Sequence, residues 1–111
     1  MEKFYVSTSA VYTNAPPHIG FAHESIVADV LARYYRLINK KVFFLTGTDE
    51  HGLKIYRAAK EAGKQPNEFS DYIAKLVKNL KTDLSLSYDY FSRTTDPRHI
   101  KAAQGLWLTI Q

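Results

Sequence analysis

The 111-residue chain contains no cysteine, and it has only four prolines, five glycines and one tryptophan. The absence of cysteine excludes a disulfide framework, a thiolate zinc site and a cysteine nucleophile in these residues. No apolar run approaches the roughly 18 residues that a membrane-spanning helix needs. The first residues do not form a secretory signal, because their apolar stretch is short and no small-residue cleavage site follows. We therefore expect a cytoplasmic protein with no membrane contact.

The chain does contain enough apolar material for a packed core, since 45% of its residues are hydrophobic and 14% are aromatic. This composition excludes general disorder. Fifteen Lys and Arg residues against eleven Asp and Glu give a net charge of +4. Such a basic excess fits a polyanionic partner such as ATP or RNA, although many soluble domains carry it without one. The length corresponds to one small domain or to part of a larger one.

Hydrophobic periodicity predicts strands that alternate with helices. The expected strands cover residues 3–9, 41–46 and 88–92, and the expected helices cover 19–39, 53–62, 66–84 and 100–111. Asp96 and Pro97 form an N-cap and first-turn pair for the last helix. This order predicts parallel strands joined by right-handed crossovers. The predicted fold class is α/β, the first half of a Rossmann-like doubly wound parallel sheet.

The apolar residues also predict which faces are buried. The helix at 19–39 has a wide apolar arc, so we expect cover on more than one side; its two stripes are Ile19, Ala22, Ile26, Val30 and Leu37, and Val27, Leu31, Tyr34 and Ile38. The helix at 66–84 should bury Phe69, Tyr72, Ile73, Leu76, Val77 and Leu80. The run at 41–46 lacks alternation, which is typical of a strand buried on both faces. The last helix has no C-terminal stop signal, which predicts a truncated domain.

The first junction between a strand and a helix carries a candidate anion site. It ends in Pro17-His18-Ile19-Gly20 at the start of a long helix, where free N–H groups and the helix dipole favour an anion. His18 can donate to a phosphate oxygen, and Gly20 allows a ligand to approach the backbone. Taken alone, these two residues favour the simpler interpretation, in which His18 only caps the helix and Gly20 only packs tightly. No G-x-G-x-x-G or G-x-x-x-x-G-K-S/T sequence is present, which excludes the usual dinucleotide and P-loop sites.

The second junction is the polar segment Thr46-Gly47-Thr48-Asp49-Glu50-His51-Gly52, predicted to be a turn from Gly47 onward. Because the carboxyl ends of neighbouring parallel strands share one edge of a sheet, this segment should lie beside the first junction. Two acids and a histidine between glycines can orient a cationic group, although an ordinary turn and helix cap has the same composition. We interpret Glu50 as a favourable acid at the start of the next helix.

The two junctions together resemble the class I aminoacyl-tRNA synthetases. Residues 17–20 are similar to their "HIGH" signature, and residues 46–52 resemble the block that follows the second strand in methionyl-tRNA synthetases. Further agreement at matching spacing comes from Tyr12, Asn14, Ala28, Asp29, Val30, Arg33 and Tyr34. The resemblance extends from about Phe4 to the end of the chain. Phe21 stands in place of the second histidine of the signature, so either His18 and the helix end suffice or activation is impaired.

The resemblance implies ATP-dependent activation of methionine to methionyl-adenylate, followed by transfer to the 3′-terminal adenosine of tRNA. It implies a catalytic role for His18 and Gly20, and contacts of ATP, bound with Mg²⁺, to His18, Ile19, Gly20 and Glu24. It implies methionine contacts to Ala10, Tyr12, Asp49 and His51.

The resemblance also implies a domain organisation. Residues 1–111 correspond to the amino-terminal half of the catalytic domain, without the later "KMSKS" loop and the cysteine-ligated zinc insertion, so no zinc ligands are expected in this segment. Contacts to tRNA are expected mainly from parts not present here. Three alternatives stay open: a class I synthetase of the leucine, valine or isoleucine type, a small nucleotidyltransferase with a related His-x-Gly-His, and a non-catalytic nucleotide-binding fragment.

Overall fold

The computed structural model describes residues 1–111 as an α/β chain, in agreement with the predicted fold class. Its elements are β1 (Lys3–Ser7), β2 (Val11–Tyr12), α1 (Ile19–Leu37), β3 (Lys41–Asp49), α2 (Leu53–Glu61), α3 (Pro66–Asp83), β4 (Tyr90–Arg93) and α4 (Pro97–Ile110). All predicted strands and helices are present. The two-residue strand β2 is additional, and it lies in the junction between the first predicted strand and the first predicted helix. None of the helices has the length and apolar character that crossing a membrane requires.

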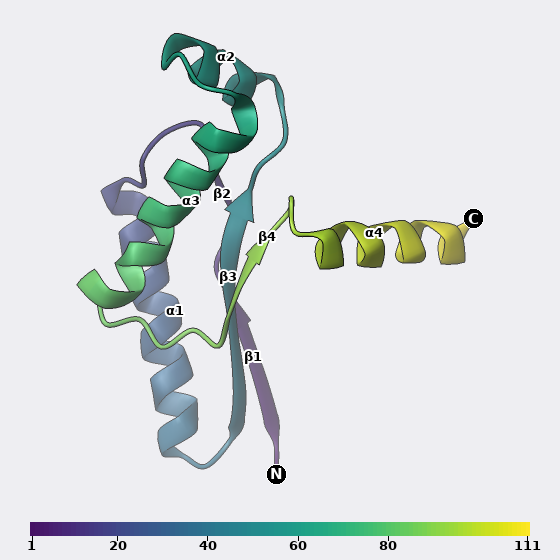
Figure 1. The fold of residues 1–111 in the computed structure, drawn as a ribbon. Helices are drawn as coiled ribbons and strands as arrows, with labels where there is room; N and C mark the ends of the chain where they lie inside the picture. The colour runs from purple at the N-terminus through teal and green to yellow at the C-terminus, as the bar shows by residue number, and fades with distance from the viewer.

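The sheet is parallel, with β3 at its centre (Figure 1). β1 pairs with the first half of β3, where Phe4 lies opposite Val42. β2 lies on the same side of β3 and pairs with its last two residues. β4 pairs on the other side, where Thr46 lies opposite Phe91. All three pairings are parallel, as the order of strands and helices predicted for β1, β3 and β4.

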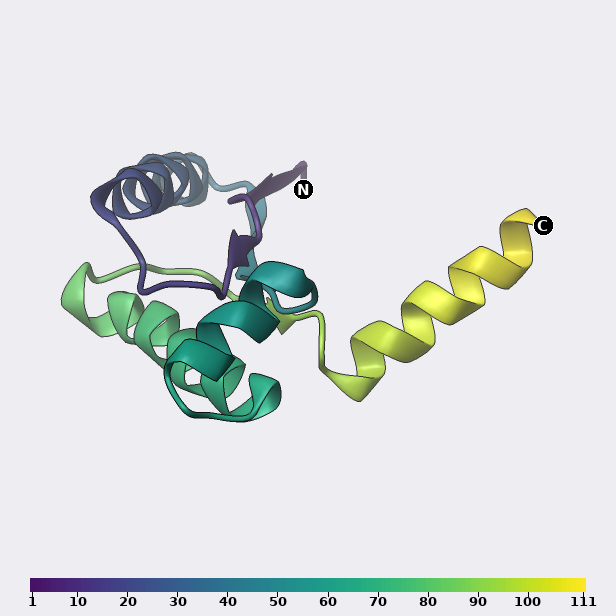
Figure 2. The same ribbon diagram turned by 90° about the horizontal axis from the view of Figure 1, so that it is seen from above.

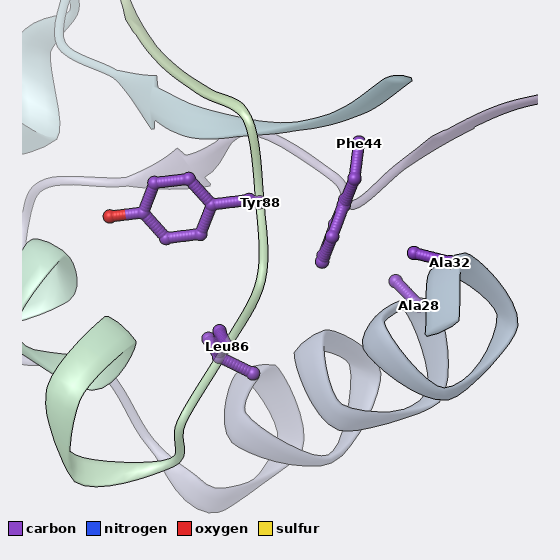
Figure 3. Packing of buried hydrophobic residues seen from close by; sticks show 5 residues of the cluster. All are labelled: Ala28, Ala32, Phe44, Leu86 and Tyr88. Atoms are coloured by element: carbon purple, nitrogen blue, oxygen red, sulfur yellow. The ribbon is translucent and has the colours of Figure 1, made fainter. Parts of the chain in front are cut away.

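α1 and α3 lie on one side of the sheet, and α4 projects away on the other (Figures 1 and 2). The core lies between the sheet and the two helices. One cluster surrounds Phe44, whose ring meets the Tyr88 ring edge-on with centroids 6.3 Å apart. Figure 3 shows Phe44 pointing toward Ala28 and Ala32 of α1, with Leu86 beside them. α4 contributes no buried residue.

α1 buries a different face from the one that its apolar stripes predicted. Its buried residues are Phe21, Ser25, Ala28, Asp29 and Ala32. Large members of both predicted stripes are exposed instead, namely Ile19, Ile26, Val27, Val30, Leu31, Tyr34, Leu37 and Ile38. The reason is steric, because small side chains allow the helix to approach the Phe44 ring closely. Within residues 1–111, α1 is therefore covered on one side only, and its large apolar residues form an exposed patch.

Two further burial predictions need correction. In α3, Ile73 and Val77 are buried as predicted, but Tyr72 is exposed and the small residues Ser70 and Ala74 take the buried positions. β3 is not buried on both faces, since Phe43 is 46% exposed. β3 also runs through Thr48 and Asp49, which the sequence predicted to lie in a turn. Its extension follows from pairing with β2 on one side and β4 on the other.

Candidate active site

β2 brings the two sequence junctions together at the carboxyl end of β3. Tyr12 lies opposite Asp49 in the strand register, and the Thr13 N–H donates to the Asp49 carbonyl oxygen at 3.2 Å. Thr13 is itself buried, with its hydroxyl 3.2 Å from that of Ser70 on α3. The start of α1 lies toward the same end of the sheet (Figure 1). The prediction that the two junctions are neighbours is therefore confirmed.

His18 is the N-cap of α1. It has an extended backbone, and its Nδ1 accepts a hydrogen bond from the Gly20 N–H at 3.0 Å. A neutral imidazole that accepts at Nδ1 carries its proton on Nε2. The ring is exposed, so the Nε2–H group is available to an oxygen of a ligand. The structural role of His18 and its predicted chemical role are thus compatible, because they use different nitrogens.

Gly20 is required by the position of the His18 ring. A Cβ atom on Gly20 would lie 2.7 Å from His18 Cε1 and 2.9 Å from Nδ1, closer than real contacts allow. A larger residue would displace the imidazole from its cap. Gly20 therefore fixes the orientation of the ring in addition to leaving the backbone accessible.

Phe21 faces the interior of the protein. It is 5% exposed and forms a cluster with Ile73 and Val77 of α3. Its ring is packed against α3, whereas His18 and Gly20 are exposed at the end of α1. The residue in the place of the second signature histidine is therefore a core residue in this chain.

Glu24 holds the loop that follows β1. Its two carboxylate oxygens accept from the Ser9 N–H at 2.5 Å and from the Ser9 hydroxyl at 3.0 Å. This contact positions the adjacent Ala10 near α1. The predicted ATP contact of Glu24 remains a prediction, and the hydrogen bonds give this carboxylate a positioning task within the protein.

Ala10 borders a cavity of about 150 Å³ at the carboxyl ends of β1, β3 and β4. The cavity is rich in hydroxyl groups; its other lining residues are Thr8, Leu45, Thr46, Gly47, Thr48, Ser92, Thr94 and His99. The hydroxyls of Thr8 and Thr46 are 2.7 Å apart. Other lining hydroxyls are also used within the protein, since Thr48 donates to the Glu50 carboxylate and Thr94 accepts from the Glu50 N–H. The sequence did not indicate that Ser92, Thr94 or His99 would meet here, because no local motif marks them.

Asp49 ends β3 with its backbone anchored and its carboxylate unpaired. The Asp49 backbone oxygen accepts hydrogen bonds from Thr13. The Asp49 carboxylate forms no hydrogen bond or ion pair within the chain. The turn that follows is packed against Tyr12: a Cβ atom on Gly52, where φ is 135°, would lie 2.0 Å from the Tyr12 hydroxyl. His51 instead leans toward the β4 side, with Nε2 3.4 Å from the Thr94 carbonyl oxygen. A half-buried carboxylate without a partner is suited to binding a cation.

The interpretation of Glu50 as an acid at a helix start is wrong. Glu50 is 5% exposed, and its carboxylate forms two hydrogen bonds with the Arg93 guanidinium, at 2.8 and 2.5 Å. Thr48 donates a third, at 2.9 Å. The hydrogen bond from Arg93 to Glu50, opposed by burial and supported by Asp71, raises the pKa of Arg93 above its ordinary value. A buried carboxylate needs such a partner, and the pair joins the ends of β3 and β4 beside Asp49.

Asp29 and Arg33, which matched the family pattern, have a structural role away from this edge. The Asp29 carboxylate accepts from the Ser87 N–H and hydroxyl, both at 2.6 Å, and from Arg33 Nε at 2.6 Å. Burial tends to raise the pKa of Asp29, but the hydrogen bonds from Ser87 and Arg33 outweigh it and hold that pKa below its usual value. These contacts attach α1 to the segment that leads into β4.

An open parallel sheet with a capped helix start and an acidic turn at its carboxyl edge is typical of nucleotide-binding α/β domains. The family described as "tRNA synthetases class I (M)" matches residues 4–111. The chain belongs to this family. Membership excludes the alternative of a small nucleotidyltransferase.

Relatives named methionine–tRNA ligase are similar over most of the chain. The protein from Thermotoga maritima is 53% identical over 102 residues, which are 92% of this chain and 16% of that protein. The chloroplastic/mitochondrial protein from Arabidopsis thaliana is 50% identical over 98 residues, which are 88% of this chain and 16% of that protein. The chain thus spans about one sixth of the length of these relatives.

Solved structures agree with this assignment. Mycobacterium tuberculosis methionyl-tRNA synthetase in complex with methionyl-adenylate has a TM-score of 0.93 and 43% identity, covering 96% of this chain and 21% of that one. The ternary LeuRS–tRNA–LeuAMS complex of Agrobacterium radiobacter K84 has a TM-score of 0.89 and 29% identity, covering 98% and 14%. The fold is therefore shared with a leucine enzyme, while sequence identity is higher to the methionine enzyme.

Proposed function

We propose that residues 1–111 form the amino-terminal half of the catalytic domain of a methionine–tRNA ligase. The complete protein would activate methionine with ATP and Mg²⁺ as substrate, release pyrophosphate and transfer the methionyl group to tRNA. The observation that carries this proposal is the unpaired Asp49 carboxylate beside Tyr12, at the same end of the sheet as the His18-capped start of α1. The methionyl-adenylate bound to the M. tuberculosis enzyme supports it.

In this proposal ATP lies at the start of α1. The His18 Nε2–H donates to a phosphate oxygen. It is free to do so because the hydrogen bond that caps α1, donated by the Gly20 N–H, uses Nδ1. The positive end of the α1 dipole at Ile19 favours the same negative charge. The Gly20 N–H is already donated to His18, so Gly20 contributes by leaving room for the ligand. Glu24 contributes by holding the loop at Ser9.

Methionine lies at the end of β3 in the same proposal. Asp49 binds the ammonium group, since a carboxylate and an ammonium form a charge-assisted hydrogen bond. The backbone of Ala10 and the ring of Tyr12 line the amino-acid pocket, with His51 at its border. The methionine carboxylate oxygen then attacks the α-phosphorus of ATP, forming the adenylate as pyrophosphate leaves. The 3′-terminal adenosine of tRNA subsequently attacks the carbonyl carbon, and AMP leaves.

The test is amino-acid-dependent exchange of pyrophosphate into ATP, measured with the complete gene product. We expect exchange with methionine and much weaker exchange with leucine, valine and isoleucine. Preference for one of the branched amino acids would instead support a synthetase of the leucine, valine or isoleucine type. No exchange with any amino acid, by a folded protein, would support a non-catalytic nucleotide-binding fragment.

A further inference from the structure

α2 has a buried side and a basic side that lie opposite each other. Ile55 and Ala59 are buried against the rest of the chain. Lys54, Arg57 and Lys60 are exposed and follow one another at intervals of three residues. Because each residue of a helix turns about 100° and rises about 1.5 Å, the three form a continuous row on the side away from Ile55 and Ala59.

The positive charge of this row is not neutralised within the chain. Elsewhere, Arg33, Arg36, Lys40, Arg93 and Arg98 each have an acidic partner within 4 Å. Lys54, Arg57 and Lys60 have none. The only acidic residue of α2 is Glu61, which is exposed and forms no ion pair with them. The row therefore presents a net positive charge to solvent.

The row lies at the end of the sheet that carries the candidate active site. α2 begins at Leu53, directly after the turn from Asp49 to Gly52, and it stands at the carboxyl end of β3 (Figure 1). Under the proposed function, the 3′ end of tRNA must reach an adenylate at this edge. The phosphates that precede its terminal adenosine consequently pass close by.

We propose that Lys54, Arg57 and Lys60 on α2 bind phosphate groups of the tRNA strand that ends in the acceptor adenosine. This inference rests on the proposed function and adds a tRNA-binding surface to it. Contacts of this kind position a nucleic acid without reading its sequence. They release counterions, so the affinity that they provide falls as the salt concentration rises.

The test compares two variants that each remove two unpaired lysines. Lys54→Gln/Lys60→Gln changes the α2 row, and Lys3→Gln/Lys41→Gln changes the amino ends of β1 and β3, at the opposite end of the sheet. In aminoacylation by the complete gene product, we expect the α2 variant to raise the KM for tRNA about tenfold at physiological salt. Its slope of log affinity against log salt should become shallower by about two. Pyrophosphate exchange, which needs no tRNA, should be unchanged in both variants.

A change of opposite sign gives an independent check. Glu61→Gln removes the single acid of α2, so it should lower the KM for tRNA and leave exchange unchanged. Equal KM values for the α2 variant, the control variant and the unmodified protein would overturn the inference, as would equal increases in the two variants. If the unmodified protein shows no exchange, the proposed function fails by itself, and direct tRNA binding by the same variants still decides whether α2 binds RNA.

Discussion

The two ring nitrogens of His18 have different tasks. Nδ1 accepts the hydrogen bond that caps α1, and Nε2 keeps the proton that the proposed reaction uses. The sequence offered the two tasks as alternatives, because a histidine at a helix start can either cap the helix or donate to an anion. The orientation of the ring could not be predicted, since it results from the contact between His18 and the bare backbone of Gly20.

Replacing His18 should separate these tasks. Asparagine is a good N-cap, whereas alanine is a poor one and costs about 1 kcal/mol of stability. We expect both His18→Asn and His18→Ala to slow adenylate formation by about 10²–10³-fold. Alanine has no donor, and the shorter asparagine amide cannot place an N–H group where the imidazole Nε2–H lies. ATP affinity should change much less, and only alanine should lower stability. Single-turnover kinetics and urea unfolding measure the two effects; full activity of His18→Asn would mean that His18 is only a cap.

Replacing Phe21 with histidine tests whether the missing signature histidine limits activity. Because its ring is buried between α1 and α3, Phe21→His should place an imidazole without a partner in the core, at a cost of about 1–3 kcal/mol. The rate of methionine activation should stay flat or fall, while the unfolding temperature decreases. Phe21→Leu, an apolar control, should retain more stability than the histidine variant. A faster activation rate for Phe21→His would show that the packed ring impairs the enzyme.

At the scale of elements, local signals predicted the boundaries well and the contacts poorly. Pro66 starts α3, Gly63 follows α2, and Asp96 caps α4 by accepting from the Arg98 N–H at 2.9 Å. These signals lie within a few residues of the boundary that they set. The strand β2 and the last residues of β3 had no such signal, because each is defined by pairing with a segment more than thirty positions away in the chain.

The buried face of α1 was mispredicted for a related reason. Large apolar residues are the usual mark of a core face, but here the sheet accepts the side that carries Ala28 and Ala32. Which face fits depends on Phe44, a residue of β3 that periodicity along α1 does not include. The partner of Glu50 was missed in the same way, since Arg93 belongs to β4 and nothing near Glu50 in the sequence indicates it.

The Glu50–Arg93 pair should stabilise the junction between β3 and β4. Glu50→Gln removes one partner of a buried pair, so we expect a loss of about 3 kcal/mol in the free energy of unfolding. Because Asp49 is the preceding residue, the KM for methionine should rise as well. Asp71→Asn is the matched control: the Asp71 side chain also contacts Arg93 but is 65% exposed, so its loss should cost at most about 1 kcal/mol. Equal effects of the two substitutions in urea unfolding would contradict this account.

At the scale of the whole molecule, one face of the sheet and one strand edge are uncovered. Tyr5 and Phe43 stack on the face opposite α1, with ring centroids 6.2 Å apart, and they are 57% and 46% exposed. β1 pairs only with β3, so its other edge is free. An apolar, unpaired edge favours pairing with another chain, and an exposed apolar surface favours association.

Residues 1–111 expressed alone should therefore self-associate and show little methionine-dependent exchange. Sedimentation velocity over a range of concentrations would measure the association. Tyr5→Lys should reduce it, because a lysine beside the open edge opposes pairing. A stable monomer whose exchange activity matches that of a full-length methionine–tRNA ligase would show that these residues suffice, and that the domain assignment is wrong.

The measurement that tests the central claim most directly is methionine-dependent pyrophosphate exchange by Asp49→Asn in the complete gene product. Losing the carboxylate opposite a desolvated ammonium costs about 2 kcal/mol or more, which corresponds to about 30-fold. We therefore predict that kcat/KM for methionine falls at least about 30-fold, while the KM for ATP stays within a few-fold. Asp83→Asn, an exposed carboxylate at the far end of α3, should change neither value. Exchange by Asp49→Asn within a few-fold of the unmodified protein would mean that Asp49 is only the last residue of a strand, and that the methionine site lies elsewhere.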